Sequence, residues 1–149
     1  MITVYTDASH YLDDKVAGWA CVVWVGNKKF TQKNGVVKSE VFDSTSAELM
    51  AIANSIAVLK NCGFKTDEKH KVMIFSDSLN AIRRLSGKTS KGAVKSNPKL
   101  TELTAKILTT FPSMWDISFH KVKAHTGARD HHSINNHLAD KLAKDALRA

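Results

Sequence analysis

Hydrophobic residues recur along the chain with two different periods, and these separate predicted strands from predicted helices. Short runs rich in β-branched and aromatic residues predict strands at residues 2–7, 16–25, 29–37, 71–77 and 115–122. The first three follow one another through short connections, which predicts an antiparallel meander. The fourth, KVMIFSD, is almost continuously apolar, as expected of a strand buried on both faces.

Helical periods begin after the third strand. Apolar residues at three- and four-residue intervals predict a helix over residues 48–59, and Gly63 follows where a C-terminal cap would lie. A second, short helix is predicted directly after residue 77, ending near Gly87. The second half of the chain therefore alternates between helices and strands.

The last two helices are predicted from their capping residues. Asn97 and Pro98 form a good N-cap and first turn for a helix running to about Thr110. Ser133 can cap a final helix that continues nearly to the C-terminus. The resulting order, β-β-β-α-β-α-α-β-α, predicts an α/β fold in which a mixed sheet carries helices on its faces.

Length and composition indicate one domain. A chain of 149 residues with 43% hydrophobic residues can close one sizeable core, so we expect a single domain over residues 1–149. Cys21 and Cys62 lie in apolar or helical segments and are expected to be free thiols. The first residues, MITVYTDAS, carry neither a basic lead nor a long apolar run, so we expect a cytoplasmic protein with no membrane partner.

The charge of the chain indicates a polyanionic partner. Lys and Arg number 22 against 14 Asp and Glu, a formal net charge of +8, and such an excess favours phosphate contacts. Part of this excess forms a cationic segment without acidic residues, made of Arg83, Arg84, Lys88, Lys91, Lys95 and Lys99. Nucleic acid is the leading candidate partner, although many basic proteins are simply soluble.

Four acidic residues lie where the predicted elements converge. Asp7 ends the first strand, Asp77 ends the fourth, Glu48 begins the first helix, and Asp140 lies on the last helix. Asp7 and Asp77 become neighbours if their strands pair in parallel, because ligands collect at the carboxyl ends of such strands. Clustered carboxylates favour hard divalent cations such as Mg²⁺, and two such ions can activate a water and stabilise the leaving oxygen of a phosphodiester.

Three of these acids also have purely structural interpretations. Glu48 completes the sequence TSAE, a capping box in which Thr45 would be the N-cap. Asp77 is well placed to cap the helix that follows it. Asp140 and Lys144 have the i,i+4 spacing of a surface ion pair.

Histidines crowd the segment before the last helix. His125, His131, His132 and His137 raise the question of zinc binding, but no cysteine lies nearby and the spacing matches no common zinc pattern. His125 is better placed to relay a proton or contact a phosphate. The roles of His131 and His132 stay open.

Taken together, the motifs resemble those of type 1 ribonucleases H, in order and across almost the whole chain. They are YTDAS, STSAELMAI, IFSDSLNAI, KVKAHTG and NNHLADKLAKDA. The resemblance implies a five-stranded mixed sheet, a three-strand meander plus two parallel strands, flanked by helices. It also implies hydrolysis of the RNA strand of RNA/DNA hybrids with 3′-hydroxyl and 5′-phosphate ends. Two Mg²⁺ ions, for which Mn²⁺ is an alternative, would be held by the residues matching Asp7, Glu48, Asp77 and Asp140.

The resemblance also implies roles for other residues. His125 matches the mobile histidine that assists turnover or product release, and Asn136 matches a residue that contacts the RNA strand. Ala8 stands where the family usually has Gly beside the RNA. Before Glu48 the family usually offers Thr, Asn and Arg to the nucleic acid, whereas this chain offers Ser44, Thr45 and Ser46 and no Arg. The basic segment 83–99 is shorter than the bacterial protrusion and lacks its tryptophans, which favours phosphate contacts over stacking.

These observations favour a monomeric, metal-dependent endoribonuclease acting on RNA/DNA hybrids. Two other functions remain open: another nuclease of the same fold, either a 3′ exonuclease or a junction resolvase, and a non-catalytic hybrid-binding domain.

Overall fold

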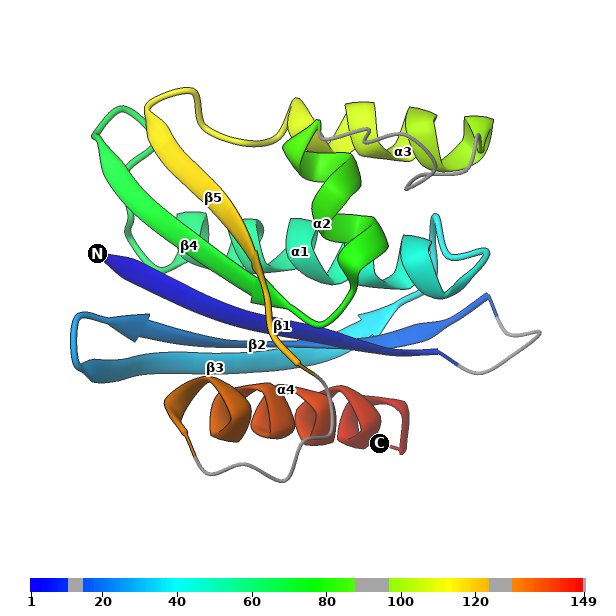
Figure 1. The fold of residues 1–149 in the computed structure, drawn as a ribbon, viewed down its shortest axis with the longest axis horizontal. Coiled ribbons are helices and arrows are strands. Elements are labelled where there is room, and N and C mark those ends of the chain that lie inside the picture. Colours follow the sequence, from blue (N-terminus) through cyan, green and yellow to red (C-terminus); the bar gives the residue numbers. More distant parts are fainter. Residues whose placement is uncertain (11–14, 88–96, 124–129, 149) are drawn as a thin grey trace.

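The computed structural model describes residues 1–10, 15–87, 97–123 and 130–148, and its element order is the predicted one (Figure 1). The strands are β1 (Ile2–His10), β2 (Ala17–Val25), β3 (Lys28–Val37), β4 (His70–Ser76) and β5 (Trp115–Lys121). The helices are α1 (Ser44–Asn61), α2 (Leu79–Ser86), α3 (Pro98–Leu108) and α4 (His131–Arg148). The predicted α/β fold is confirmed.

The five strands form one mixed sheet in the order β3-β2-β1-β4-β5. The meander is antiparallel, as predicted, while β4 pairs in parallel with both β1 and β5. In the register of the central pair, Tyr5 of β1 lies beside Phe75 of β4. This pairing places the carboxyl ends of β1 and β4 side by side.

Helices cover both faces of the sheet, with α1, α2 and α3 on one side and α4 alone on the other (Figure 1). Apolar residues of α1 and the sheet, such as Leu49, Ile52 and Val4, form the main core. A smaller core lies under α4 around Val22 and Ala139. One face of the sheet is therefore covered by three helices and the other face by α4 alone.

Close backbone packing sets the position of α4 on β2. A Cβ atom added at Gly18 would lie 2.0 Å from the carbonyl oxygen of Ala143. Only a residue without a side chain fits there, so the approach of α4 to the sheet depends on this glycine.

The structure corrects three predictions of the residue that caps the start of a helix. Asp43, not Thr45, is the N-cap of α1: its carboxylate accepts from the Ser46 amide at 2.7 Å, and the Ser46 hydroxyl accepts from the Asp43 amide at 3.0 Å. The helix therefore begins at Ser44, and Glu48 is free of the predicted capping role. A threonine and an aspartate both suit such caps, and the extended backbone at Asp43 decides between them.

At two other helix starts the capping residue also differs from the predicted one. Ser78, not Asp77, caps α2 by accepting from the Ala81 amide. The amide and hydroxyl of Ser133 donate to the carboxylate of Asp130, so Ser133 lies inside α4 and is not its cap. The prediction for Asn97, which accepts from the Leu100 amide, is confirmed.

Candidate metal centre

Three of the four predicted carboxylates meet at the carboxyl ends of the neighbouring strands β1 and β4. Asp7, Glu48 and Asp77 each offer an oxygen that lies within 4.8 Å of the others. Asp7 belongs to β1, Asp77 directly follows β4, and Glu48 projects from the second turn of α1. The parallel pairing of β1 with β4 brings the two aspartates together, as the sequence predicted.

A backbone amide links two of these carboxylates. The Ala8 N–H donates to Oδ1 of Asp7 at 2.9 Å and to Oε1 of Glu48 at 3.3 Å. The second oxygen of Glu48, Oε2, is buried and has no hydrogen-bond partner among the described residues. A buried carboxylate oxygen without a partner is costly unless a cation completes its surroundings. The all-oxygen donor set therefore fits a hard divalent cation.

Burial and mutual repulsion raise the pKa values of two of these acids. Asp7 is 3% exposed, and its pKa rises from 3.8 to about 8, first because of burial and then because of the charge of Asp77. The pKa of Glu48 lies well above its usual range because of burial and the charges of Asp7 and Asp77. Without a cation the centre holds protons, and a divalent cation would take their place.

The fourth acid, Asp140, is not brought into this group. It lies half-buried on α4, where the ammonium group of Lys144 contacts its Oδ2 at 3.0 Å. The predicted surface ion pair is therefore present. The charge of Asp140 still contributes to raising the pKa of Asp7, which places it near the centre.

The predicted nucleic-acid contacts have different surroundings. Ser44 is exposed, and the Thr45 hydroxyl accepts from the Asn80 side chain at 3.1 Å. Ser46 is fully buried, and its hydroxyl is used in the α1 cap. Asn136 is 6% exposed on α4. Of these residues, only the first two present a hydroxyl at the surface.

Several predicted residues fall on parts of the chain that are not described. His125, Lys88, Lys91 and Lys95 lie outside the described residues. Arg83 and Arg84 belong to the last turn of α2. The structure therefore describes the two ends of the basic segment, with Arg83 and Arg84 in α2 and Lys99 in α3, and not the lysines between them.

Sequence reasoning missed Asn80, which joins α1 to α2. Its amide group donates to the Thr45 hydroxyl, and its carbonyl oxygen accepts from Nε of Arg84 at 3.3 Å. Asn80 follows Asp77 by three residues, and the predicted short helix offered the only signal that it would face α1.

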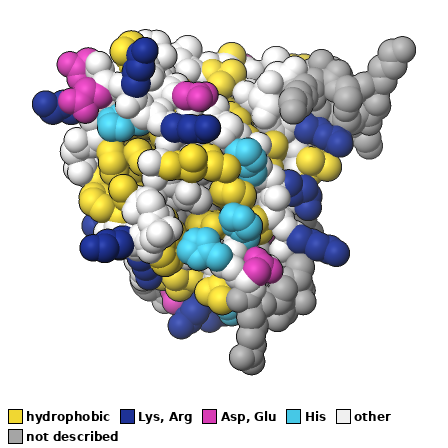
Figure 2. Space-filling model, turned by 60° about the vertical axis from the view of Figure 1, so that its left-hand side comes forward, with side chains coloured by type: hydrophobic (Ala, Val, Ile, Leu, Met, Phe, Trp, Pro, Cys, Tyr) yellow, Lys and Arg dark blue, Asp and Glu magenta, His cyan; other side chains and the backbone are white. Residues whose placement is uncertain are grey.

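Sequence reasoning also missed a ring cluster on the α4 side of the sheet. Its members are Tyr5, Trp24, Phe75, His120, His131 and His132. Figure 2 shows histidine side chains gathered among apolar ones on one face of the molecule. Neither His131 nor His132 takes part in a metal-binding group among the described residues.

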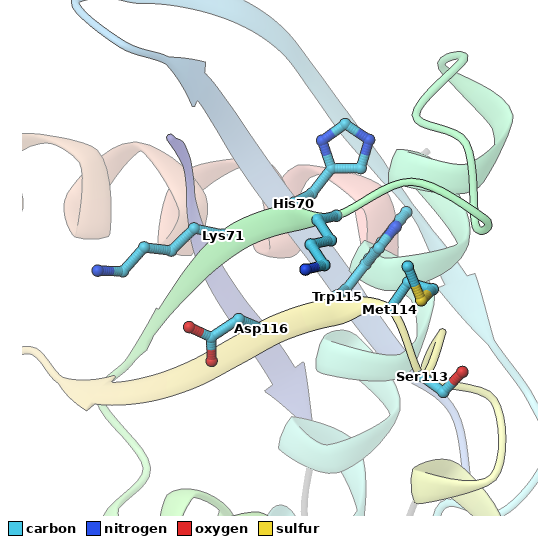
Figure 3. A pocket seen from close by; sticks show the side chains of 7 residues that line it. His70, Lys71, Ser113, Met114, Trp115 and Asp116 are labelled. Carbon is cyan, nitrogen blue, oxygen red and sulfur yellow. The ribbon is translucent and has the colours of Figure 1, made fainter.

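A surface pocket of about 500 Å³ lies at the opposite end of β4 and β5 (Figure 3). Its lining includes Lys69, His70, Lys71, Trp115 and Asp116. Because these residues begin the two strands whose other ends approach the carboxylates, the pocket is separate from the candidate centre.

None of the helices in the described ranges combines the length and the apolar character needed to cross a membrane.

Comparisons with known proteins agree with this geometry. RNase H1 from a compost metagenome has 21% identity and a TM-score of 0.74, covering 99% of this chain and 95% of that one. RNase H1 from the archaeon Halobacterium salinarum has 20% identity and a TM-score of 0.71, covering 99% and 97%. A structure of the compost RNase H1 with an RNA/DNA hybrid has 18% identity and a TM-score of 0.72, covering 99% of both chains.

These likenesses establish the fold. A search of curated proteins gave no significant match. The sequence pattern of the RNase H family, however, matches residues 1–148, almost the whole chain. The chain therefore belongs to the RNase H family.

Proposed function

We propose that this protein is an endonuclease that hydrolyses the RNA strand of RNA/DNA hybrids with two divalent cations. The observation that carries the proposal is the meeting of Asp7, Glu48 and Asp77, with one buried Glu48 oxygen left unpartnered. Membership of the RNase H family and the +8 charge support the same function, as does the hybrid bound to a protein of the same fold.

In this proposal the carboxylates hold the cations, with Mg²⁺ preferred and Mn²⁺ as a substitute. When bound, such cations activate the attacking water and stabilise the leaving oxygen, which gives 3′-hydroxyl and 5′-phosphate ends. Asp7 and Asp77 are the most direct ligands, Glu48 contributes its free oxygen, and Asp140 completes the site from α4. His125 assists proton movement or product release.

The hybrid is proposed to contact both sides of this centre. Ser44 and Thr45 at the start of α1, the Ala8 backbone and Asn136 would meet the strands near the scissile phosphate. The residues of the basic segment would bind phosphates farther away, namely Arg83, Arg84, Lys88, Lys91 and Lys95. Because Ser46 is buried in the α1 cap, its contribution would be to hold this helix start in place.

We also propose that the protein acts as a cytoplasmic monomer. Cys21 is buried, Cys62 is partly buried, and both are free thiols, as in proteins of reducing compartments.

The function is tested with end-labelled RNA/DNA hybrid, double-stranded RNA, single-stranded RNA, double-stranded DNA and a branched DNA junction, each with Mg²⁺ and with chelator. We expect metal-dependent internal cuts confined to the RNA of the hybrid. Asp77→Asn should lower kcat by at least about a hundredfold, because a ligand charge is lost, while the fold is kept. Asp116→Asn, which removes an exposed charge from the distant pocket, is the matched control and should cleave normally.

Three results would overturn the proposal. Trimming of DNA ends would indicate an exonuclease, and cutting of branched DNA a resolvase. Metal-independent binding of hybrid without any cleavage would indicate a non-catalytic binding domain.

A further inference from the structure

The ring cluster is built on the strands that carry the candidate centre. Tyr5 and Phe75 are register partners of the parallel strands β1 and β4, and their rings stack with centroids 5.2 Å apart. Tyr5 precedes Asp7 by two residues in a continuous strand, so both side chains lie on one face of the sheet. Phe75 precedes Asp77 by the same interval. A group held against these two rings is therefore held at a fixed place relative to the carboxylates.

His132 is such a group. Its ring stacks on Phe75 with centroids 4.5 Å apart and an interplanar angle of 24°. Its Nδ1 lies 2.6 Å from the Tyr5 hydroxyl oxygen. Tyr5 is 1% exposed, and burial together with the charge of Asp130 raises its pKa to about 12, so the hydroxyl keeps its proton. His132 thus ties the first turn of α4 to both β1 and β4.

The same helix carries the missing acid. His132, Asn136 and Asp140 follow one another at four-residue intervals and lie along one side of α4. The eight residues between His132 and Asp140 span about 12 Å of helix. Because a helix is stiff over this length, fixing its first turn also fixes the direction in which Asn136 and Asp140 project from α4 and their position along the helix axis.

We propose that Tyr5 and His132 form a positioning pair, in which the Tyr5 hydroxyl donates to Nδ1 of a neutral His132 and thereby fixes the place of α4, and of Asp140 on it, relative to the carboxylate group. This inference rests on the proposed function. Neither residue touches substrate in this role, and each acts through the helix.

The pair has a specific pH signature. A neutral imidazole protonated on Nε2 can accept at Nδ1, whereas an imidazolium carries protons on both nitrogens and cannot accept. Among the described residues, the titratable groups around His132 are Tyr5 from β1, His120 from β5 beyond the Phe75 ring, and Asp130 and His131 at the start of its own helix. Protonation of His132 therefore removes the contact with Tyr5 and should lower kcat on the acidic side.

The test compares kcat and KM for hybrid cleavage between about pH 5.5 and 8.5. Tyr5→Phe and His132→Phe keep the rings and remove the hydrogen bond. Each should lower kcat roughly two- to tenfold, and this factor should exceed the rise in KM. The kcat of the double variant should be no lower than that of the less active single variant.

Two further variants separate positioning from mere packing. His132→Asn offers an amide oxygen close to the place of Nδ1 and does not titrate. It should keep kcat near the wild-type value at high pH and lose the acidic decline that depends on His132. His137→Asn, a change of the same kind at an exposed position of α4, should leave the profile unaltered.

A measurement without substrate tests the pair itself. Nitrogen NMR of the His132 ring should show the tautomer protonated on Nε2 in the wild type, with the Nδ1 signal shifted in Tyr5→Phe. Additive losses in the double variant, or an unchanged profile in Tyr5→Phe, would overturn the positioning role while the proposed function stands. A wild type that shows the NMR signature but never cleaves hybrid would overturn the function, and the role of the pair with it.

Discussion

At the scale of single residues, the candidate centre is distinguished by where its charges are buried. Asp7 and Glu48 are removed from water and lie beside Asp77, so their ionisation is opposed by both desolvation and repulsion. The Ala8 amide compensates only part of this cost, since it reaches one oxygen of each carboxylate. The arrangement is thus more favourable with a bound cation than without one.

This burial predicts how stability depends on pH without metal. In the unfolded chain the Asp7 carboxyl ionises near its ordinary pKa of 3.8, whereas in the metal-free folded protein it keeps its proton up to about pH 8. The folded state binds that proton more tightly between these values, so the free energy of unfolding should fall as pH rises from about 4 to about 8, by roughly 2–4 kcal/mol.

Urea unfolding in chelator at pH 5 and pH 8 measures this decline. Asp7→Asn should reduce it, because an amide does not ionise and still accepts from the Ala8 amide. Adding Mg²⁺ at pH 8 should stabilise the wild type and leave Asp7→Asn less affected. A wild type whose stability is flat or rises over this range would contradict the assigned cause.

At the scale of elements, the site depends on how α1 and α4 are fixed to the sheet. The Asp43 cap sets where α1 begins and so where Glu48 projects. On the other face, Trp24 donates to the Asn135 side chain at 2.9 Å, which adds a second attachment near the start of α4. Farther along, Gly18 allows α4 to approach β2 closely. The positions of Glu48 and Asp140 therefore depend on contacts outside the centre.

Gly18→Ala tests the last of these attachments. The added methyl would overlap the Ala143 carbonyl, so α4 must shift, and the free energy of unfolding should fall by roughly 1–3 kcal/mol or more. Gly26→Ala is the comparison, since Gly26 has a φ of 58° and no atom within 4 Å of an added Cβ. That change should cost about 1–2 kcal/mol through backbone strain alone.

Denaturant unfolding and hybrid cleavage should separate the two glycine variants. We expect Gly18→Ala to lose activity as well as stability, because Asp140 moves with α4. Gly26→Ala, in the turn between β2 and β3, should lose stability only. Full activity in a destabilised Gly18→Ala variant would show that the position of α4 does not matter for catalysis.

At the scale of the whole molecule, the positive charge should act mainly through phosphates. A chain of net charge +8 releases counterions when it binds a nucleic acid, so affinity for hybrid should fall linearly with the logarithm of salt concentration. Arg83 and Arg84 lie in α2, directly after the segment that carries Asp77. We expect the hybrid to contact this side of the molecule.

The double variant Arg83→Ala/Arg84→Ala checks this expectation. It should weaken hybrid binding and lower the salt slope by about two, one for each lost phosphate contact. Lys28→Ala/Lys29→Ala removes the same charge at the start of β3, which lies at the opposite end of β1 from Asp7. Equal slopes for both variants, measured by fluorescence anisotropy, would argue against a phosphate site on α2.

Much of this molecule could be predicted because the responsible patterns are local. The strands follow from runs of β-branched residues, and the meeting of Asp7 with Asp77 follows from parallel pairing of their strands. Three N-caps lie one to three positions from the predicted residue, because neighbouring polar residues compete for the same amides, whereas Asn97 was predicted correctly. The contact between Tyr5 and His132 joins residues 127 positions apart. No local pattern encodes such a contact, so it became visible only in the folded chain.

The central place of β1 has a consequence for the order of folding. Its antiparallel partner β2 follows within a few residues, whereas its parallel partner β4 begins only at His70, after α1. Local contacts close at a smaller entropic cost than distant ones, so during synthesis the meander can form before β4 has been made. Asp7 is then already in place when Asp77 arrives. Asp7, Glu48 and Asp77 therefore meet in the step that joins β4 to the meander.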